Sequence, residues 1–277
     1  MELSGVGIYF INLEKRKDRL ESFVGQFQES DLSIERVAAV SGSEVGSNIS
    51  APAEVIACWR SHQKVYKLLI ESQNSHAVVF EDDALITREV LEWLEGITSS
   101  NFRGIDLFQI GYLKSKRISL HHVEFDPAPF NLLNLGKCIG YALARIDIVY
   151  RNWIRFSRSF LLVFLSAVSK IEIGLNSELR NKLNKFNNYF SNERRIRTQL
   201  QVKYPLVYHS FEAGAHAYVI SRELASVMST FNSPVFLPAD LCFMGVARGK
   251  NFKILRTSKS MCSQAKSISS ISLRTNV

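Results

Sequence analysis

The first 111 residues alternate short apolar runs with longer amphipathic runs, and this alternation restricts the fold more than any other feature. Apolar runs rich in β-branched and aromatic residues predict strands over residues 5–13, 33–40, 76–81 and 105–111. Apolar residues at helical spacing predict helices over residues 14–30, 53–72 and 87–97, the last with Thr87 as N-cap. This β-α-β-α-β-α-β order predicts an α/β domain with a mostly parallel central sheet flanked by helices.

In sheets of this kind, ligands bind at the carboxyl ends of the strands. No GxGxxG and no GxxxxGK[ST] sequence follows any predicted strand. A Rossmann dinucleotide site and a P-loop are therefore not expected. Farther along the chain, residues 214–231 predict another strand that leads into a helix, and "GKCIGYALA" (136–144) is a further strand candidate.

Composition narrows the class of protein. A chain of 277 residues, 46% of them hydrophobic, can bury the core of one large domain or of one domain with an insertion. The first residues, "MELSGVGIYFINLEKR", lack the features of a signal peptide, and the longest apolar run, Phe160–Val168, is about half as long as a membrane-spanning helix. The four cysteines form no CxxC pair, so we expect reduced thiols and no zinc cluster.

The positive charge of the chain is concentrated in one segment. Residues 151–210 contain 11 Lys and Arg against three Glu, which equals the formal net charge of +8 for the whole chain. Such a segment beside an apolar run suggests an anionic partner such as a membrane surface, an acidic lipid-linked glycan or nucleic acid. A solvated helical face rich in Lys and Arg is the alternative, and the segment alone does not distinguish the two.

Three consecutive carboxylates follow the apolar strand in "HAVVFEDDALI" (76–86). Repulsion and desolvation oppose the ionisation of Glu81, Asp82 and Asp83 there unless a cation compensates them. Strand geometry would direct Glu81 and Asp83 to one side and Asp82 to the other. Two carboxylates on one side with open coordination positions suit Mg²⁺ or Mn²⁺ together with the phosphates of a substrate. A helix-capping or turn role is the alternative.

An ordered set of short sequences extends this interpretation: "INLEKRKDRL", "RVAAVSG", "IACWRSHQKVYKLLIES", "HAVVFEDDALI", "IDLFQIGY", "GAHAYVISRELA" and "PADLCF". Over residues 1–112 and 212–245 the set resembles glycosyltransferase family 25, which includes bacterial lipooligosaccharide galactosyltransferases and collagen galactosyltransferases. The resemblance implies a GT-A-type fold, a nucleotide-sugar donor (most often UDP-galactose), Mn²⁺ or Mg²⁺ as cofactor, and inversion at the anomeric carbon. The segment between these parts and the tail do not match the family pattern.

The resemblance also assigns roles to residues. Asp240 matches the P-x-D element and is the candidate catalytic base, with a metal or acceptor ligand and a turn-forming Asp as alternatives. Glu81 and Asp83 are the candidate metal ligands. For donor binding, Arg16 or Arg19 could pair with the diphosphate, or both could belong to an exposed helix face.

Five further residues complete the predicted donor site: Asn12, Ser61, His62, Asp82 and His216. Ser61 and His62 match the S-H step of the family's helix, although a packed, hydrogen-bonded histidine is the alternative for His62. His216 and Tyr218 alternate with apolar neighbours and would face the same side of the sheet. A buried histidine satisfied by backbone is the alternative for His216.

We therefore expect a metal-dependent, inverting glycosyltransferase that adds galactose to a lipooligosaccharide or related surface glycan, and no nucleic-acid partner. It would be cytoplasmic and peripheral at the inner face of the membrane. A metal-dependent nucleotidyltransferase and an inactive nucleotide-sugar-binding paralogue are the alternatives. The expected division is a nucleotide-sugar and metal-binding half (1–112), a variable basic, partly helical insertion that contacts acceptor or membrane (113–210), the rest of the catalytic domain (211–248) and a tail (249–277).

Overall fold

The structure is a computed structural model of the 277-residue chain. It describes residues 5–47, 51–113, 188–189, 191–233, 235, 237–247 and 252–265. Apart from residue 188, these belong to one compact unit formed by Met1–Lys116 and Tyr189–Val277, and the second unit is Arg117–Asn188. The strand candidate at 136–144, the apolar run Phe160–Val168 and Cys138 lie outside the described residues.

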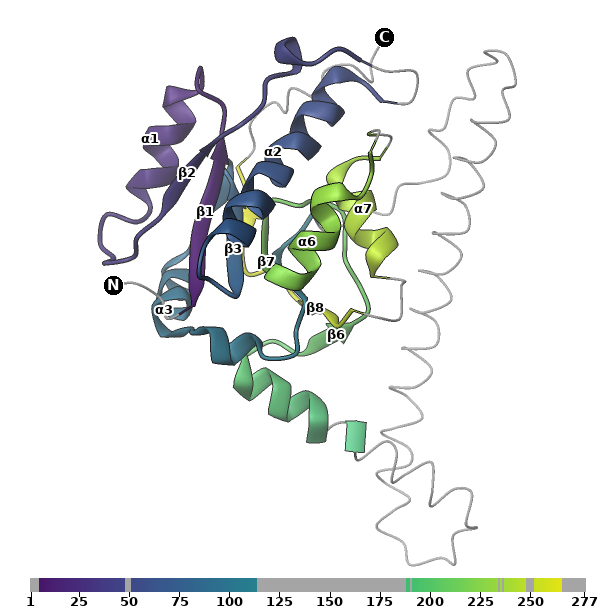
Figure 1. The fold of residues 1–277 in the computed structure, drawn as a ribbon. Coiled ribbons are helices and arrows are strands. Elements are labelled where there is room, and N and C mark those ends of the chain that lie inside the picture. Colours follow the sequence, from purple (N-terminus) through teal and green to yellow (C-terminus); the bar gives the residue numbers. More distant parts are fainter. Residues whose placement is uncertain are drawn as a thin grey trace, which may run out of the picture. The chain divides into compact units, whose positions relative to one another are not determined.

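The centre of the first unit is a mixed β-sheet (Figure 1). Its strands are β1 (Val6–Asn12), β2 (Glu35–Ala38), β3 (His76–Glu81), β5 (Leu107–Gly111), β6 (Leu206–Tyr208), β7 (Ala217–Ser221) and β8 (Ile254–Thr257). Their spatial order is β2-β1-β3-β7-β5-β8-β6. A second, small sheet pairs β4 (Ala84–Leu85) with β9 (Ser263–Gln264).

Strand directions bring several carboxyl ends to one edge of the sheet. β1 pairs in parallel with β2 and β3, and β5 pairs in parallel with β8. β7 lies between β3 and β5 and is antiparallel to both, and β6 is antiparallel to β8. β1, β2, β3, β5 and β8 therefore point the same way, and β7 begins at the edge where they end. The predicted α/β class with a mostly parallel sheet is confirmed, with β6 and β7 as the strands that make the sheet mixed.

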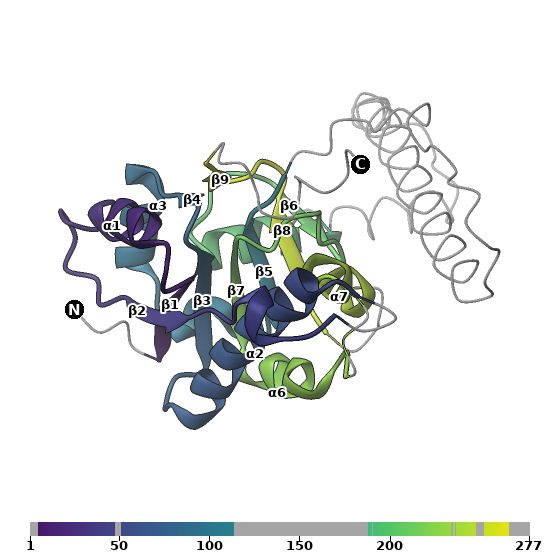
Figure 2. The same cartoon turned by 90° about the horizontal axis from the view of Figure 1, so that it is seen from above.

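Helices cover both faces of this sheet (Figures 1 and 2). One face packs against α1 (Lys17–Gly25) and α3 (Arg88–Gly96), and the other against α2 (Ala53–Glu71), α6 (Arg222–Thr230) and α7 (Ala239–Val246). The alternation of side chains along β7 shows this division. Tyr218 and Ile220 belong to the core under α2, α6 and α7, whereas Ala217 and Val219 belong to the core under α1 and α3.

Local sequence accounts for the helices of the first half. In α2 the buried residues recur at helical spacing, so one side of the helix is buried and mostly apolar, with Ser61 and His62 as its polar members: Ile56, Ala57, Trp59, Ser61, His62, Val65, Tyr66 and Leu69. Helix α3 begins after Thr87, whose side chain accepts a hydrogen bond from the amide of Val90 and confirms the predicted N-cap. Helix α1 is shorter than the predicted range of 14–30. Short 3-10 helices cover Gly42–Glu44 and Ser99–Phe102.

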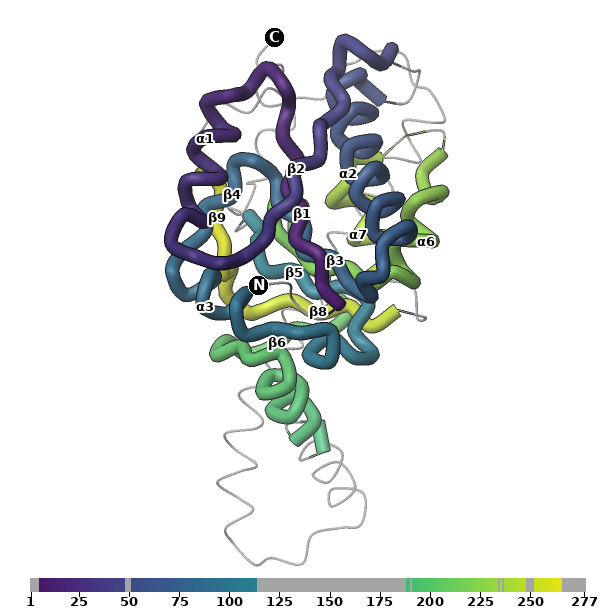
Figure 3. Tube along the Cα trace, turned by 60° about the vertical axis from the view of Figure 1, so that its left-hand side comes forward, coloured from purple at the N-terminus to yellow at the C-terminus, as the bar shows by residue number. Residues whose placement is uncertain are grey.

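Residues after 190 contribute to the same core. Residues 191–199 are helical, and Ile196 and Leu200 are buried against α3 and its neighbours. The indole nitrogen of Trp93 donates a hydrogen bond to the carbonyl of Leu200 at 2.8 Å. Strand β9, in yellow, lies beside β4 in Figure 3. Within the described part of the chain, no helix combines the length and apolar character needed to cross a membrane.

Candidate functional site

The candidate site lies at the edge of the sheet where β1 and β3 end and β7 begins. β1 ends at Asn12, β3 ends at Glu81, and His216 directly precedes β7. The amide of Glu81 donates a hydrogen bond to the carbonyl of His216 at 3.0 Å, and the amide of Asp82 donates to the carbonyl of Ile11 at 3.1 Å. Polar residues from three strands are therefore neighbours at this edge.

The acidic run continues from the strand into a turn. β3 ends at Glu81, and Asp82 and Asp83 form the turn to β4. Strand alternation, on which the prediction of Glu81 and Asp83 on one side was based, does not extend to Asp82 and Asp83, because the extended conformation stops at Glu81. Arg19 contacts both members of the turn, since its Nη1 donates to Asp82 Oδ1 at 2.8 Å and to Asp83 Oδ2 at 3.3 Å.

Arg19 and Asn12 supply the polar partners of Asp82. Asn12 Nδ2 donates to Asp82 Oδ2 at 2.8 Å, and Arg36 Nε donates to Asn12 Oδ1 at 3.0 Å. Asn12 is buried. A guanidinium from α1 is thus one of the cations that compensate the acidic charge.

The surroundings of Asp83 disfavour its ionised form, in spite of the hydrogen bond from Arg19. Gln264 Nε2, from β9, lies 3.1 Å from each Asp83 oxygen. Burial, and next the negative charge of Glu81, raise the pKa of Asp83 from 3.8 to about 6, against the lowering influence of Gln264 and Arg19. The charge of Glu81 therefore acts on Asp83 and opposes its ionisation.

Glu81 has a different environment. His62 Nε2 lies 3.3 Å from Glu81 Oε1, and His62 Nδ1 lies 2.8 Å from the hydroxyl of Tyr218. The Tyr218 hydroxyl in turn lies 3.1 Å from that of Tyr66. Burial raises the pKa of Glu81, but the hydrogen bond to His62 and the electrostatic influence of His62, His216 and Arg19 outweigh it, so the net shift is downward. His62, which the buried hydroxyl of Tyr218 contacts, therefore favours the ionised form of Glu81.

His216 is buried beside Glu81, and neither ring nitrogen makes a hydrogen bond of ordinary geometry with the described residues. Burial lowers its pKa, against the charge of Glu81 and the backbone of Cys262. Two glycines leave room for the ring: a Cβ on Gly111 would lie 2.7 Å from His216 Nε2, and one on Gly214, where φ is +95°, would lie 3.1 Å from Nδ1. The backbone of Cys262 is the nearest approach to the alternative of a histidine satisfied by backbone, and the place of His216 in the donor site stays a prediction.

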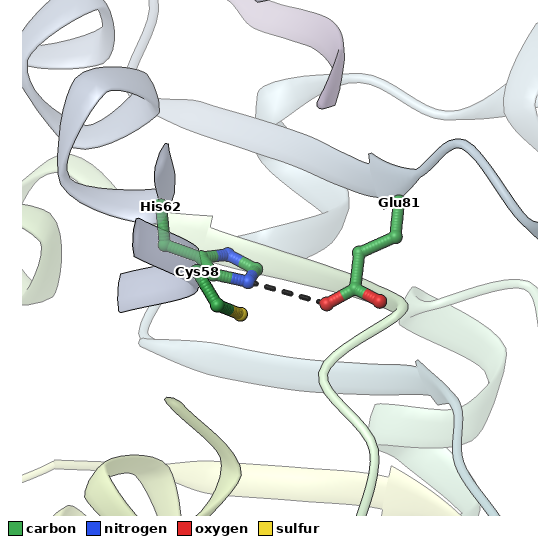
Figure 4. Close-up of side chains that lie close together, drawn as sticks. All are labelled: Cys58, His62 and Glu81. Atoms are coloured by element: carbon green, nitrogen blue, oxygen red, sulfur yellow. Dashed lines mark hydrogen bonds and ion pairs between the residues drawn. The ribbon is translucent and has the colours of Figure 1, made fainter. Parts of the chain in front are cut away.

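Cys58 joins this cluster from α2. Its thiol, a ring nitrogen of His62 and a carboxylate oxygen of Glu81 lie within 4.8 Å of one another (Figure 4). Burial raises the pKa of the Cys58 thiol well above its usual range, and the charges of Glu81, Asp240 and Asp83 add to the effect. Asp240 therefore lies within electrostatic reach of the same cluster as the strand-end acids. Among the described cysteines, Cys58, Cys242 and Cys262 are free thiols, as expected.

Asp240 lies in the first turn of α7. Its Oδ2 accepts from the amide of Gly214 at 3.3 Å and its Oδ1 from the amide of Leu241 at 2.9 Å. The contact with Gly214 connects the start of α7 to the segment that carries His216.

Two predicted donor-site residues have other partners. The hydroxyl of Ser61 is buried, donates to the carbonyl of Ala57 at 2.7 Å and accepts from the amide of Val40 at 2.9 Å. Arg16 pairs with Asp18 at 2.6 Å, although it remains within the electrostatic influence of Asp82 and Asp83. Of the ten predicted site residues, hydrogen bonds connect these to one another in the described structure: Asn12, Arg16 (through its carbonyl), Arg19, His62, Glu81, Asp82, Asp83 and His216.

Three residues contact the predicted site residues but were not among them: Cys58, Tyr218 and Gln264. Cys58 precedes His62 by one helical turn, and this spacing was a usable signal. Tyr218 was expected on the same side of the sheet as His216, but its contact with His62 depends on the packing of α2. No local signal identifies Gln264, which contacts Asp83 across 181 positions of sequence.

The fold and site define a mixed α/β protein with an acidic, histidine-containing site at the carboxyl edge of its sheet. Residues 6–129 match the model of glycosyltransferase family 25, described as LPS biosynthesis protein. The match confirms the resemblance to this family for that part of the chain, which is less than half of its length. It contains β1, β3 and the acidic run, and it ends before β7 and α7. No curated protein matches the chain.

Proposed function

We propose that the protein is an inverting hexosyltransferase that moves galactose from UDP-galactose to a lipooligosaccharide or related surface glycan. The observation that carries this proposal is the convergence of Glu81, Asp82 and Asp83 with Arg19, His62 and His216 at the carboxyl edge of the sheet. In α/β sheets this edge is where ligands bind. The acidic run also lies in the part of the chain that matches the glycosyltransferase family.

The donor diphosphate binds near Arg19 and Arg16 in this proposal. Both guanidinium groups are within the electrostatic influence of Asp82 and Asp83, and Arg19 is partly exposed. A guanidinium can bind phosphate oxygens through two parallel hydrogen bonds. Asn12 orients Asp82, and these two residues form the floor of the donor site together with His62 and His216. Ser61 supports the site indirectly by connecting α2 to the segment after β2.

Glu81 and Asp83 fit a hard divalent cation such as Mn²⁺ or Mg²⁺. Both offer carboxylate oxygens, which such ions prefer, and the charge of Glu81 helps raise the pKa of Asp83. A cation between them would relieve that repulsion. When bound, the ion supplies positive charge near the departing UDP. The protein's own contribution is to hold the two carboxylates, with Arg19 and Gln264 beside them, at the end of β3.

Asp240 acts as the general base in this proposal. Its carboxylate is oriented by the amides of Gly214 and Leu241, and its charge influences the same thiol as the charges of Glu81 and Asp83. As the base, Asp240 can accept the proton of the acceptor hydroxyl. The hydroxyl oxygen then attacks the anomeric carbon from the face opposite the UDP group. Inversion of configuration follows from a single displacement of this kind.

The acceptor is a lipid-linked oligosaccharide at the inner face of the cytoplasmic membrane, where the protein is peripheral. The basic residues of segment 151–210 support this part of the proposal. Of these, Arg194 and Arg195 are exposed on the helix over residues 191–199, whose apolar side is buried in the core.

The test is incubation of the purified chain with labelled nucleotide sugars and truncated glycolipid acceptors, followed by mass analysis of the product. We expect hexose addition from UDP-galactose, and a loss of about 10²–10⁴-fold in turnover for Asp240→Asn. Glu95→Gln, an exposed carboxylate on α3, is the matched control and should retain full activity.

Other outcomes identify the alternatives. Release of pyrophosphate from a nucleoside triphosphate, with nucleotide sugars left intact, would identify a nucleotidyltransferase. Binding of UDP-sugars without turnover across the acceptor panel would identify an inactive paralogue.

A further inference from the structure

We propose that Cys58, His62 and Glu81 form a binding site for a borderline-soft divalent ion of the Zn²⁺ and Co²⁺ class. The site differs from the Glu81 and Asp83 pair in its chemistry, because it adds a thiolate and an imidazole to one carboxylate. These donor types favour Zn²⁺ and its relatives over Mg²⁺ and Mn²⁺. Three protein ligands also leave a fourth position for water or another ligand.

The backbone brings the three side chains together without a loop rearrangement. Cys58 and His62 are four residues apart on α2 and therefore lie on the same side of that helix. Glu81 is the last residue of β3, on which α2 packs. Figure 4 shows the sulfur and the imidazole pointing from the helix toward the carboxylate.

The observed separations are close to those of a coordinated ion. In a tetrahedral site with metal–nitrogen and metal–oxygen distances of about 2.0–2.1 Å, those two ligand atoms are about 3.3 Å apart. The distance between His62 Nε2 and Glu81 Oε1 is 3.3 Å. All three ligand atoms are within 4.8 Å of one another. A thiolate about 3.6 Å from the nitrogen completes this geometry, so the sulfur needs to approach the nitrogen by at most about 1.2 Å.

A second hydrogen bond orients the imidazole. His62 Nδ1 lies 2.8 Å from the Tyr218 hydroxyl, which lies 3.1 Å from the Tyr66 hydroxyl. When Nδ1 carries the hydrogen and donates it to Tyr218, the lone pair of Nε2 is directed at Glu81 and at the ion. Metal-binding histidines usually have such a partner on the second ring nitrogen.

A metal ion can reach this site from solvent, and its binding requires only the loss of a proton from Cys58. The side chain of His62 is 1% exposed, whereas that of Glu81 is 26% exposed, so an ion can enter from the Glu81 side. Coordination replaces the S–H bond of Cys58 with a sulfur–metal bond and releases one proton to solvent. Neither an oxidant nor a reductant is required.

Glu81 is a ligand both in the Cys58, His62 and Glu81 site and in the proposed Glu81 and Asp83 site, so the two kinds of ion compete for its carboxylate. An ion held by Cys58 and His62 engages the carboxylate that the proposed hard-ion site shares with Asp83. We therefore expect Zn²⁺ to inhibit Mn²⁺-supported transfer. This inhibition rests on the proposed function, whereas binding of the ion does not.

The test is titration of the metal-free chain with Co²⁺, which reports its ligands by absorption. We expect a thiolate-to-cobalt charge-transfer band in the near ultraviolet that saturates at one equivalent. Cys58→Ser should abolish the band, and Cys242→Ser, which removes another buried thiol, should retain it. Tyr218→Phe should weaken Co²⁺ binding by about 10–100-fold.

X-ray absorption of the wild-type Co²⁺ complex provides a measurement that depends on no variant, and it should show one sulfur ligand. Absence of the band or of the sulfur ligand would overturn the proposal, as would a band that persists in Cys58→Ser. Asp83→Asn should keep the band while impairing transfer. Sugar transfer by the wild type without cobalt–sulfur ligation would exclude the metal site and leave the proposed function intact. Cobalt–sulfur ligation without sugar transfer would support the metal site and contradict the proposed function.

Discussion

Three consecutive carboxylates at the end of β3 have three different sets of partners. Glu81 is bound to His62, Asp82 to Asn12 and Arg19, and Asp83 to Arg19 and Gln264. The pKa of Glu81 is lowered, while that of Asp83 is raised to about 6. Neighbouring acids in one motif therefore need not share one role, because their contacts decide which charges the fold tolerates.

The raised pKa of Asp83 makes a prediction for stability in the metal-free protein. Its side chain is 10% exposed, and its pKa rises from 3.8 to about 6 on folding. Ionisation of Asp83 therefore destabilises the folded state. This destabilisation is absent below about pH 4, grows as the pH rises to about 6 and is complete above that pH. A shift of about two units corresponds to about 3 kcal/mol. Asp83→Asn should accordingly raise the free energy of unfolding by up to about 3 kcal/mol near pH 7.5.

Urea unfolding in the presence of a chelator measures this effect. The gain in Asp83→Asn should fall toward zero as the pH is lowered from about 6 to about 4. Glu95→Gln, which is exposed, should show no such trend. An Asp83→Asn variant less stable than the wild type at every pH would show that the contacts with Gln264 and Arg19 outweigh the charge.

Gly111 makes a second prediction at the residue scale. An added Cβ would lie 2.7 Å from both His216 Nε2 and the Cβ of Ala217. Gly111→Ala must therefore displace β7 or the imidazole, and we expect a loss of about 1–3 kcal/mol in stability together with reduced activity. Gly245→Ala is the matched control, because a Cβ there meets nothing within 4 Å, and its stability should remain within about 1 kcal/mol of wild type. Equal melting temperatures for the two variants would contradict this account of the contact.

At the scale of elements, local periodicity predicted most of the helices and strands in the first half of the chain, although not β4 or the ends of α1. Strands β1, β2, β3 and β5 and helices α2 and α3 lie where the apolar spacing predicted them, with differences of a few residues at their ends. The strand β7 and the helix α6 were also predicted. Strands β6, β8 and β9 were not predicted, because each is only two to four residues long and is defined by pairing with a distant strand.

The helix over residues 191–199 makes a prediction about membrane binding. Ile196 and Leu200 anchor it in the core, while Arg194 and Arg195 are exposed and Arg197 is partly exposed. Changing the three arginines to Gln removes three positive charges but keeps polar side chains, so the fold should persist. We expect weaker sedimentation with anionic vesicles, by about 1 kcal/mol for each charge near the surface.

A triple variant at other exposed basic positions serves as the control for this experiment. Lys67, Arg88 and Arg103 are exposed on the described surface and lie outside segment 151–210. Their change to Gln lowers the net charge equally and should leave vesicle binding closer to wild type. Equal losses in the two triple variants would indicate attraction through net charge alone, and unchanged binding in the arginine variant would exclude its role.

At the scale of the whole molecule, the site depends on contacts that no local pattern contains. The acidic run, His62 and Arg19 could be selected from motifs, but their pairing required α1 and α2 to pack on opposite faces of one sheet. The turn conformation of Asp82 and Asp83 follows from the β4 and β9 pair, and β9 comes from the end of the chain. Ser61, which lies within a recognised motif, has a structural contact that the motif does not reveal, because its hydroxyl connects α2 to the segment after β2.

Ligand binding should stabilise the whole molecule if the proposed donor site is correct. A ligand present at about 100 times its dissociation constant adds about 2.7 kcal/mol to the stability of the native state. For a domain of about 150–250 residues, 1 kcal/mol shifts the melting temperature by about 2–4 °C. UDP-galactose with Mn²⁺ should thus raise the melting temperature by about 5–10 °C, and by more than GDP- or CDP-sugars at equal concentration.

Because Asp83 is a proposed ligand of the ion, Asp83→Asn should lose the part of the increase that depends on Mn²⁺, whereas Glu95→Gln should keep it. An identical response to all nucleotide sugars, or a Mn²⁺ effect that survives in Asp83→Asn, would contradict the assignment of this edge of the sheet as the donor site.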